Sequence, residues 1–181
     1  EDITLSDTTL DAAVLNTLDG HTSGVIDASS INTLTGAADE LNAAYSSNGI
    51  TGLDDEDITL SDTTLDAAVL NTLDGNTSGV IDASSITTLT GAADELITTY
   101  NANGSGITGL GDEAVNVSSD NASTSQANTL ASATSAVVTA SISDGDMATL
   151  AGLNETGSEV NAYTITITDT SVDAAALNTL D

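Results

Sequence analysis

The chain has 181 residues and carries 28 Asp and Glu residues but no Lys or Arg, so its formal net charge at neutral pH is −28. Nucleic acid and anionic membranes are poor partners for such a chain, because both attract Lys and Arg. The sequence contains no cysteine, which excludes a disulfide framework. It also has no apolar run of the roughly 18 residues that would predict a membrane span.

Apolar residues make up 39% of the chain and are placed periodically, which argues against disorder despite the charge. The only large rings belong to Tyr45, Tyr100 and Tyr163, so we expect a thin aliphatic core. A stack of repeats suits such a core, because each repeat needs to cover only its neighbours.

The chain is internally repetitive. Residues 2–45 align without gaps with residues 57–100, and only five of these 44 positions differ. A diverged third copy and a partial fourth copy follow. We therefore predict one continuous array over residues 1–181, with repeats at 2–56, 57–113, 114–163 and 164–181. We expect it to be a fragment of a longer protein.

Each repeat opens with an extended segment, residues 3–6 in the first copy, where apolar and polar residues alternate. Thr8 and Asp11 resemble a capping box ahead of a helix over residues 12–18, and Gly20 stands where a C-cap glycine belongs. The motif LNTLDG at 15–20 closes this helix and recurs at 70–75.

The second half of each repeat begins with another extended stretch, residues 25–27. We expect a short helical turn at 29–34, a helix at 36–45 and then a loop that includes residues 48–57. The counterpart loop, residues 101–113, is two residues longer.

Strands that alternate with helices at short spacing imply parallel pairing with right-handed crossovers. We therefore predict an α/β fold: a right-handed βα solenoid with a parallel sheet on one side and short helices on the other. Its strands would begin near Ile3, Ile26, Ile58, Ile81, Val115, Val138 and Ile165.

The repeats also serve as an internal test for catalytic residues, which should be singular. His21 is the only histidine, and its counterpart in a nearly identical repeat is Asn76. Carboxylate pairs could support glycoside hydrolysis, but here the carboxylates recur with the repeat. We therefore predict that the protein is not an enzyme.

Calcium is the cofactor that the composition allows, because hard cations prefer carboxylate, amide and carbonyl oxygens. The first candidate site is the acidic run in the loop and its counterpart. Its residues are Asp54, Asp55, Glu56, Asp57, Asp112 and Glu113. The alternative is a solvated acidic turn.

A second candidate calcium site lies in the loop after the second LNTLDG motif. Asp74, Asn76 and Asp82 occupy positions 1, 3 and 9 of an EF-hand-like loop. Position 12 is Ser85 rather than the bidentate Glu of such loops. The alternative is an ordinary helix-to-strand turn.

Three motifs of the second copy resemble repeats of very long secreted proteins of marine cyanobacteria. They are LNTLDGNTSG at 70–79, TLTGAADELITTY at 88–100 and ITGLGDE at 107–113. These proteins include calcium-binding exoproteins and a giant surface protein associated with swimming without flagella. The resemblance implies an extracellular, cell-surface location and a non-enzymatic role.

Two functions remain open from the sequence. The first is a structural segment of a surface protein, involved in surface coating, adhesion or motility. The second is a module whose repeats bind calcium or glycan. The expected partners are neighbouring repeats of the same chain, other surface proteins or polysaccharide.

Overall fold

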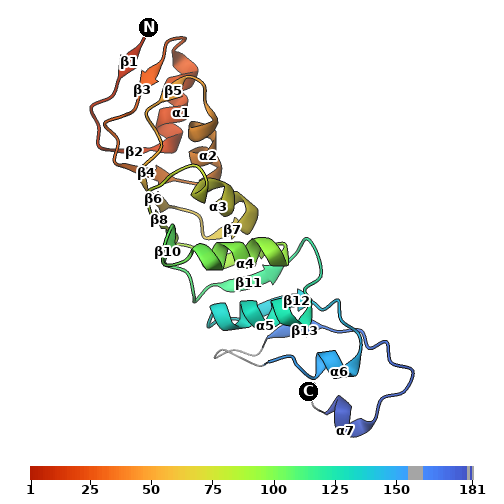
Figure 1. Cartoon of the computed structure of the whole chain (residues 1–181). Coiled ribbons are helices and arrows are strands. Elements are labelled where there is room, and N and C mark those ends of the chain that lie inside the picture. Colours follow the sequence, from red (N-terminus) through yellow and green to blue (C-terminus); the bar gives the residue numbers. More distant parts are fainter. Residues whose placement is uncertain (155–160, 179, 181) are drawn as a thin grey trace. The chain divides into compact units, whose positions relative to one another are not determined.

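The computed structural model describes residues 1–154, 161–178 and 180. Parallel β-strands alternate with helices along the chain, so the α/β class is confirmed (Figure 1). The chain forms two compact units. Unit 1 consists of Glu1–Ile86 with Ala102–Leu110, and unit 2 consists of Thr87–Asn101 with Gly111–Asp181.

Unit 1 is built from strand–helix segments, each of which has two or three short strands followed by a helix. In chain order its elements are β1 (Ile3–Thr4), β2 (Thr9–Asp11), α1 (Ala12–His21), β3 (Ile26–Asp27), β4 (Thr33–Gly36), α2 (Ala38–Ser46), β5 (Ile50–Thr51), β6 (Asp57–Leu60), β7 (Thr64–Asp66), α3 (Ala67–Asp74), β8 (Ile81–Asp82) and β10 (Ile107–Thr108). Helix α2 packs against both α1 and α3.

Unit 2 continues the same alternation. Its elements are β9 (Thr88–Gly91), α4 (Ala93–Ala102), β11 (Ala114–Val117), α5 (Thr124–Ala133), β12 (Val138–Ser141), α6 (Met147–Leu150), β13 (Ala162–Thr164) and α7 (Ala174–Leu177). The strands β9, β11, β12 and β13 are neighbours in one parallel sheet.

Two parallel sheets run through unit 1, in the orders β1-β3-β5 and β2-β4-β6-β8-β10. In the second sheet Leu10 pairs with Leu34, and Leu34 pairs with Ile58. Paired residues are therefore about 24 positions apart in the sequence. Two strand–helix segments make up one sequence repeat, and the ladder β1-β3-β5 ends at β5 while the ladder that contains β4 and β6 continues into the next copy.

Strand β6 has a double role at the junction between the first two copies. In the sequence it is the counterpart of β1, the first strand of its copy. In the sheet it pairs with β4, a second strand, on one side and with β8 on the other. In unit 2, β11 lies between β9 and β12 in the same way. The ladder that contains β6 is therefore continuous from the first copy into the second, and the ladder that contains β11 is continuous from the second copy into the third.

The core of each unit is aliphatic, as predicted. In unit 1, side chains with no solvent exposure come from strands and helices alike, and examples are Leu15, Leu34, Leu41, Leu70 and Ile81. In unit 2 they include Leu89, Leu96, Leu130 and Val138. Burial of a Leu, Ile or Val side chain stabilises a fold by about 1.5–3 kcal/mol, so these ladders do not need an aromatic core.

Several local predictions are confirmed, and others are wrong. The first helix and the strand around Ile26 are present, but the helix continues through Gly20 to His21, so its C-cap is Thr22 rather than Gly20. The helix predicted from residue 36 begins at Ala38, because Gly36 has a φ of 139° that a helix cannot contain. The helical turn predicted at 29–34 is wrong at its end, where Leu34 lies between Thr33 and Thr35 in strand β4.

Two strand predictions are also wrong. Residues 50–51, predicted as part of a loop, form strand β5, because their backbone pairs with β3. The fourth copy was expected to begin with a strand at Ile165, but the strand there is β13, which ends at Thr164. It lies earlier because Tyr163 pairs with Ala140 of β12.

Candidate functional site

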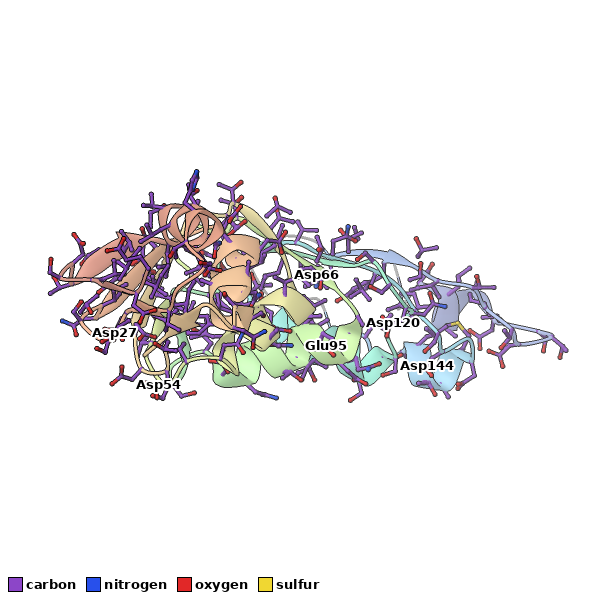
Figure 2. The ribbon with its side chains drawn as sticks, turned by 90° about the horizontal axis from the view of Figure 1, so that it is seen from above. Asp27, Asp54, Asp66, Glu95, Asp120 and Asp144 are labelled. Carbon is purple, nitrogen blue, oxygen red and sulfur yellow. The ribbon has the colours of Figure 1, made fainter. Side chains whose placement is uncertain are left out.

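The acidic loop of unit 1 does not present its four carboxylates together. Asp54, Asp55 and Asp57 are exposed, and Figure 2 shows Asp54 at the rim of the ribbon. Glu56 has no exposed surface at all. Strand β6 begins at Asp57, and the alternation of buried and exposed positions along it extends back to Glu56.

The buried carboxylate of Glu56 has hydrogen-bond donors on both oxygens. The hydroxyl of Tyr45, in helix α2, donates to Oε2 at 3.0 Å. The backbone N–H of Asp54 donates to Oε1 at 3.3 Å. We call this arrangement the Tyr45–Glu56 pair. It joins the end of α2 to the loop that leads into β6.

Unit 2 contains the counterpart, the Tyr100–Glu113 pair. Glu113 is 1% exposed, and the Tyr100 hydroxyl donates to its Oε1. Its Oε2 accepts from the backbone N–H groups of Gly111 at 2.8 Å and Asp112 at 3.2 Å. The two glutamates among the sequence candidates, Glu56 and Glu113, are therefore buried and hydrogen-bonded within the protein.

Both tyrosines act as neutral hydrogen-bond donors. Burial raises the pKa of Tyr45 and Tyr100 above the ordinary value, and the negative charges of Glu56 and Glu113 raise these pKa values further. Each hydroxyl therefore keeps its proton at neutral pH and donates a hydrogen bond to the carboxylate.

The remaining residues of the acidic run have separate roles. Oδ1 of Asp57 accepts the backbone N–H of Val80 at 2.9 Å. The backbone carbonyl of Asp54 accepts the N–H of Ser78 at 2.9 Å. Asp55 and Asp112 are exposed side chains. The loop is therefore held by the side chains of Glu56 and Asp57 together with its backbone, and Asp54, Asp55 and Asp112 are exposed.

The second candidate site is not assembled either. Asn76 Nδ2 donates to Asn42 Oδ1 at 2.9 Å, and Asp82 Oδ1 accepts the N–H of Ser84 at 3.0 Å. The carboxylate of Asp74 lies over Gly106, where an added Cβ would be 2.2 Å from Oδ1. The three side chains thus have three separate surroundings. Hydrogen bonds from Ser84 lower the pKa of Asp82.

Within residues 1–154, 161–178 and 180, no group of three or more His, Cys, Asp or Glu side chains is arranged to hold a metal ion.

Many other carboxylates bind the N-termini of helices. Asp11 and Asp66 accept backbone N–H groups of their own helices, α1 and α3. The first N–H groups of α2, α4, α5 and α6 instead receive carboxylates from later in the sequence. These carboxylates belong to Asp62, Asp120, Asp144 and Asp169, at distances of 2.7 to 3.1 Å. The sequence pattern does not predict these contacts.

A signal for these contacts was present in the sequence. Helix α2 follows Ala37, whose side chain cannot accept a hydrogen bond. A helix start without a capping residue needs an acceptor from elsewhere. Asp62 supplies it, and the negative charge also suits the positive end of the helix dipole.

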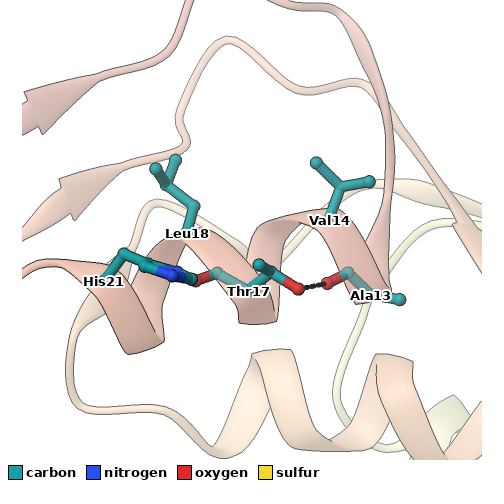
Figure 3. Close-up of a pocket in the computed structure, with 5 residues that line it drawn as sticks. All are labelled: Ala13, Val14, Thr17, Leu18 and His21. Atoms are coloured by element: carbon teal, nitrogen blue, oxygen red, sulfur yellow. Dashed lines mark hydrogen bonds between the residues drawn. The ribbon is translucent and has the colours of Figure 1, made fainter.

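His21 lies at one end of a shallow hollow on α1, of about 410 Å³, whose lining includes Ala13, Val14, Thr17 and Leu18 (Figure 3). Its Nδ1 is 2.6 Å from the Thr17 carbonyl oxygen. The Thr17 hydroxyl donates to the Ala13 carbonyl at 2.7 Å. The hollow is thus mainly an apolar surface on one helix rather than a group of reactive side chains.

None of the helices that the structure describes is long and apolar enough to cross a membrane. Comparisons of the chain with protein-family models, with curated proteins and with solved structures find no match.

Proposed function

We propose that this chain is a non-enzymatic structural segment of a large extracellular, cell-surface protein. In this proposal the strand–helix segments follow one another as a right-handed solenoid, and the segment acts as a spacer in a surface layer or in adhesion or motility. The observation that carries the proposal is the use of the carboxylates. Carboxylates are the side chains of this chain that could act in catalysis, but those of Glu56 and Asp62 accept hydrogen bonds from helix α2 and from the loop that follows it.

The junction between copies supports the same function. Strand β6 pairs with the last complete segment of one copy and with the next segment of its own copy. In a chain with this property one ladder continues from each copy into the next, although the first ladder of a copy ends at its β5-type strand. Spacers need this property, whereas a catalytic domain does not.

The net charge of −28 suits a hydrated surface protein in saline surroundings. Like charges repel one another, which opposes aggregation of neighbouring copies but also opposes compact folding. At about 1 M salt the Debye length is only about 3 Å, so most of this repulsion is screened.

The test is a length series measured by small-angle X-ray scattering in high salt. One protein is the present chain, and the other two contain one or two additional tandem copies of residues 57–113. Two strand–helix segments per copy and a strand spacing of about 4.8 Å predict that the maximum dimension grows by about 10 Å per copy. The cross-section should stay constant. A particle that grows equally in all directions would contradict the proposal.

A calcium- or glycan-binding module is the second candidate function. It is favoured by the exposed carboxylates of Asp54, Asp55 and Asp112, which the internal hydrogen bonds leave accessible. Thermal unfolding with calcium, with magnesium at equal ionic strength and with a chelator tests the calcium form. A midpoint raised by calcium alone would support it, and equal midpoints in the two salts would count against it.

A further inference from the structure

The same nine residues, AAVLNTLDG, occur at 12–20 within α1 and at 67–75, which comprise α3 and its C-cap Gly75. The structure therefore shows one helix sequence in two surroundings within unit 1. Leu73 of α3 has no exposed surface, whereas its counterpart Leu18 in α1 is half-buried. Val14 of α1 is 56% exposed, whereas its counterpart Val69 is only partly exposed.

Helix α2 accounts for the difference, because it packs on α3. Asn42 of α2 donates from Nδ2 to the Val69 carbonyl oxygen at 3.2 Å. Its Oδ1 accepts from Nδ2 of Asn76 at 2.9 Å. Val69 and Leu73 of α3, together with Asn76 just after the helix, therefore form the surface that receives a helix of the α2 type.

The same side of α1 carries the apolar hollow. Its residues Val14, Leu18 and His21 are the counterparts of Val69, Leu73 and Asn76. Figure 3 shows Val14 and Leu18 projecting from the same side of α1. Helix α2 contacts α1 elsewhere, through Asn16 and Glu40.

We propose that the Val14–Leu18–His21 face of α1 is the docking surface for an α2-type helix of a preceding repeat. The inference rests on the proposed function as a tandem array. The occupant is defined by the α2–α3 interface: a segment with the sequence of residues 24–56, whose Asn42 counterpart faces α1. In unit 1, that same stretch leads directly into Asp57, the counterpart of Asp2.

His21 fits this occupant although it replaces Asn76. The Thr17 carbonyl can only accept a hydrogen bond, so Nδ1 of His21 carries the proton that it donates. Nε2 is then an acceptor, so the incoming asparagine would turn its amide N–H₂ toward His21, the reverse of the orientation in which Asn42 presents Oδ1 to Asn76.

The experiment extends the full chain by a second copy of residues 24–56 placed directly before Asp2. The protein has no cysteine, so a single introduced thiol reports on one position. The probe is Leu18→Cys. Leu73→Cys serves as the covered reference, and Val80→Cys, at a residue that is 40% exposed, serves as the exposed reference.

Extension should slow thiol labelling of Leu18→Cys by about tenfold or more, toward the rate of Leu73→Cys, because labelling then requires local opening. Val80→Cys should be unaffected. An extension in which the Leu41 counterpart is replaced by Asp cannot bury that helix and should restore fast labelling. Fast labelling despite a folded added helix, shown by circular dichroism, would overturn the inference.

The other possible occupant is a second copy of the chain. It would appear as slow labelling of Leu18→Cys in the unextended protein that becomes fast on dilution, and this result would also overturn the inference. The scattering series separates this failure from failure of the proposed function. Growth in length together with an unprotected Leu18→Cys would reject only the docking surface.

Discussion

The hydroxyl of Tyr45 donates a hydrogen bond of 3.0 Å to Oε2 of Glu56, a carboxylate without solvent exposure. A buried carboxylate is normally paired with a cation, but this chain has no Lys or Arg. Neutral hydrogen-bond donors take the place of the cation, and the same arrangement occurs at Tyr100 and Glu113 in unit 2. The stability of unit 1 should therefore depend on the Tyr45 hydroxyl, and the stability of unit 2 should depend on the Tyr100 hydroxyl.

Replacement Tyr45→Phe should destabilise unit 1 by about 1.5–3 kcal/mol, the range for hydrogen bonds to charged groups. The phenyl ring remains, but Glu56 keeps only the N–H of Asp54 as a described donor. Urea unfolding followed by circular dichroism measures the change without altering ionic strength. Tyr100→Phe should act on unit 2 in the same way.

A double replacement supplies the control. In Tyr45→Phe with Glu56→Leu both partners become apolar, and such pairs are often close to neutral. The double variant should therefore recover much of the stability that Tyr45→Phe loses. If it were less stable than the single variant, the hydrogen bond would not be the source of the loss.

Stability should fall at alkaline pH because of the same pairs. The pKa of both tyrosines is raised in the folded protein by burial and by the adjacent glutamates. An unfolded tyrosine ionises near pH 10, so the stabilisation is complete below about pH 10 and is lost as the pH rises toward the folded pKa. Unfolding midpoints between pH 9 and 12 measure this decline.

The double variant Tyr45→Phe with Tyr100→Phe tests the assignment of the alkaline decline. It should start from a lower stability at pH 9 but lose less of it as the pH rises. A decline that is as steep as that of the parent protein would mean that other groups are responsible. Absorbance at the tyrosinate wavelength reports the ionisation independently.

Asp62→Ala should cost about 0.5–2 kcal/mol, the usual effect of removing a helix cap. Its Oδ2 accepts the N–H of Ala38 at 2.8 Å, and the side chain of Ala37 cannot replace it. Asp55→Ala removes the same charge from an exposed position of the same unit and is the matched control. Equal unfolding free energies for the two variants would show that the effect is general charge repulsion.

Two glycines should respond to alanine in opposite directions. Gly52 has a φ of 81°, and a Cβ there would be 2.8 Å from the Ser29 backbone nitrogen. Gly52→Ala should therefore cost at least about 1–2 kcal/mol. Gly20 lies within α1, where an added Cβ meets nothing within 4 Å. Gly20→Ala should stabilise by about 0.5–1 kcal/mol, measured by the same urea titration.

The sequence predicts the helices and the buried aliphatic positions well, because apolar residues recur at regular spacing wherever one face of a helix or strand is buried. The short strands are harder to predict. Ile50 and Thr51 lie between Gly49 and Gly52, a context typical of a turn, and become a strand only through pairing with β3. The prediction of one ladder therefore missed β5, and it also missed β2 and β4, which form a second ladder.

The role of Glu56 could not be predicted from the acidic run in which it occurs. Four consecutive acidic residues are typical of a solvated turn, and burial of the third depends on Tyr45, eleven positions earlier. The recurrence of Tyr and Glu at nearly the same separation in the second copy was the available signal. The helix caps were hidden for a similar reason, because Asp62 and Ala38 are 24 positions apart.

The double pairing of β6 has a consequence for how such a gene can change. Whole 55-residue blocks can be duplicated or excised in frame, and each resulting joint again places a first strand against a second strand. Length polymorphism in steps of complete copies is therefore the form of variation that this architecture tolerates.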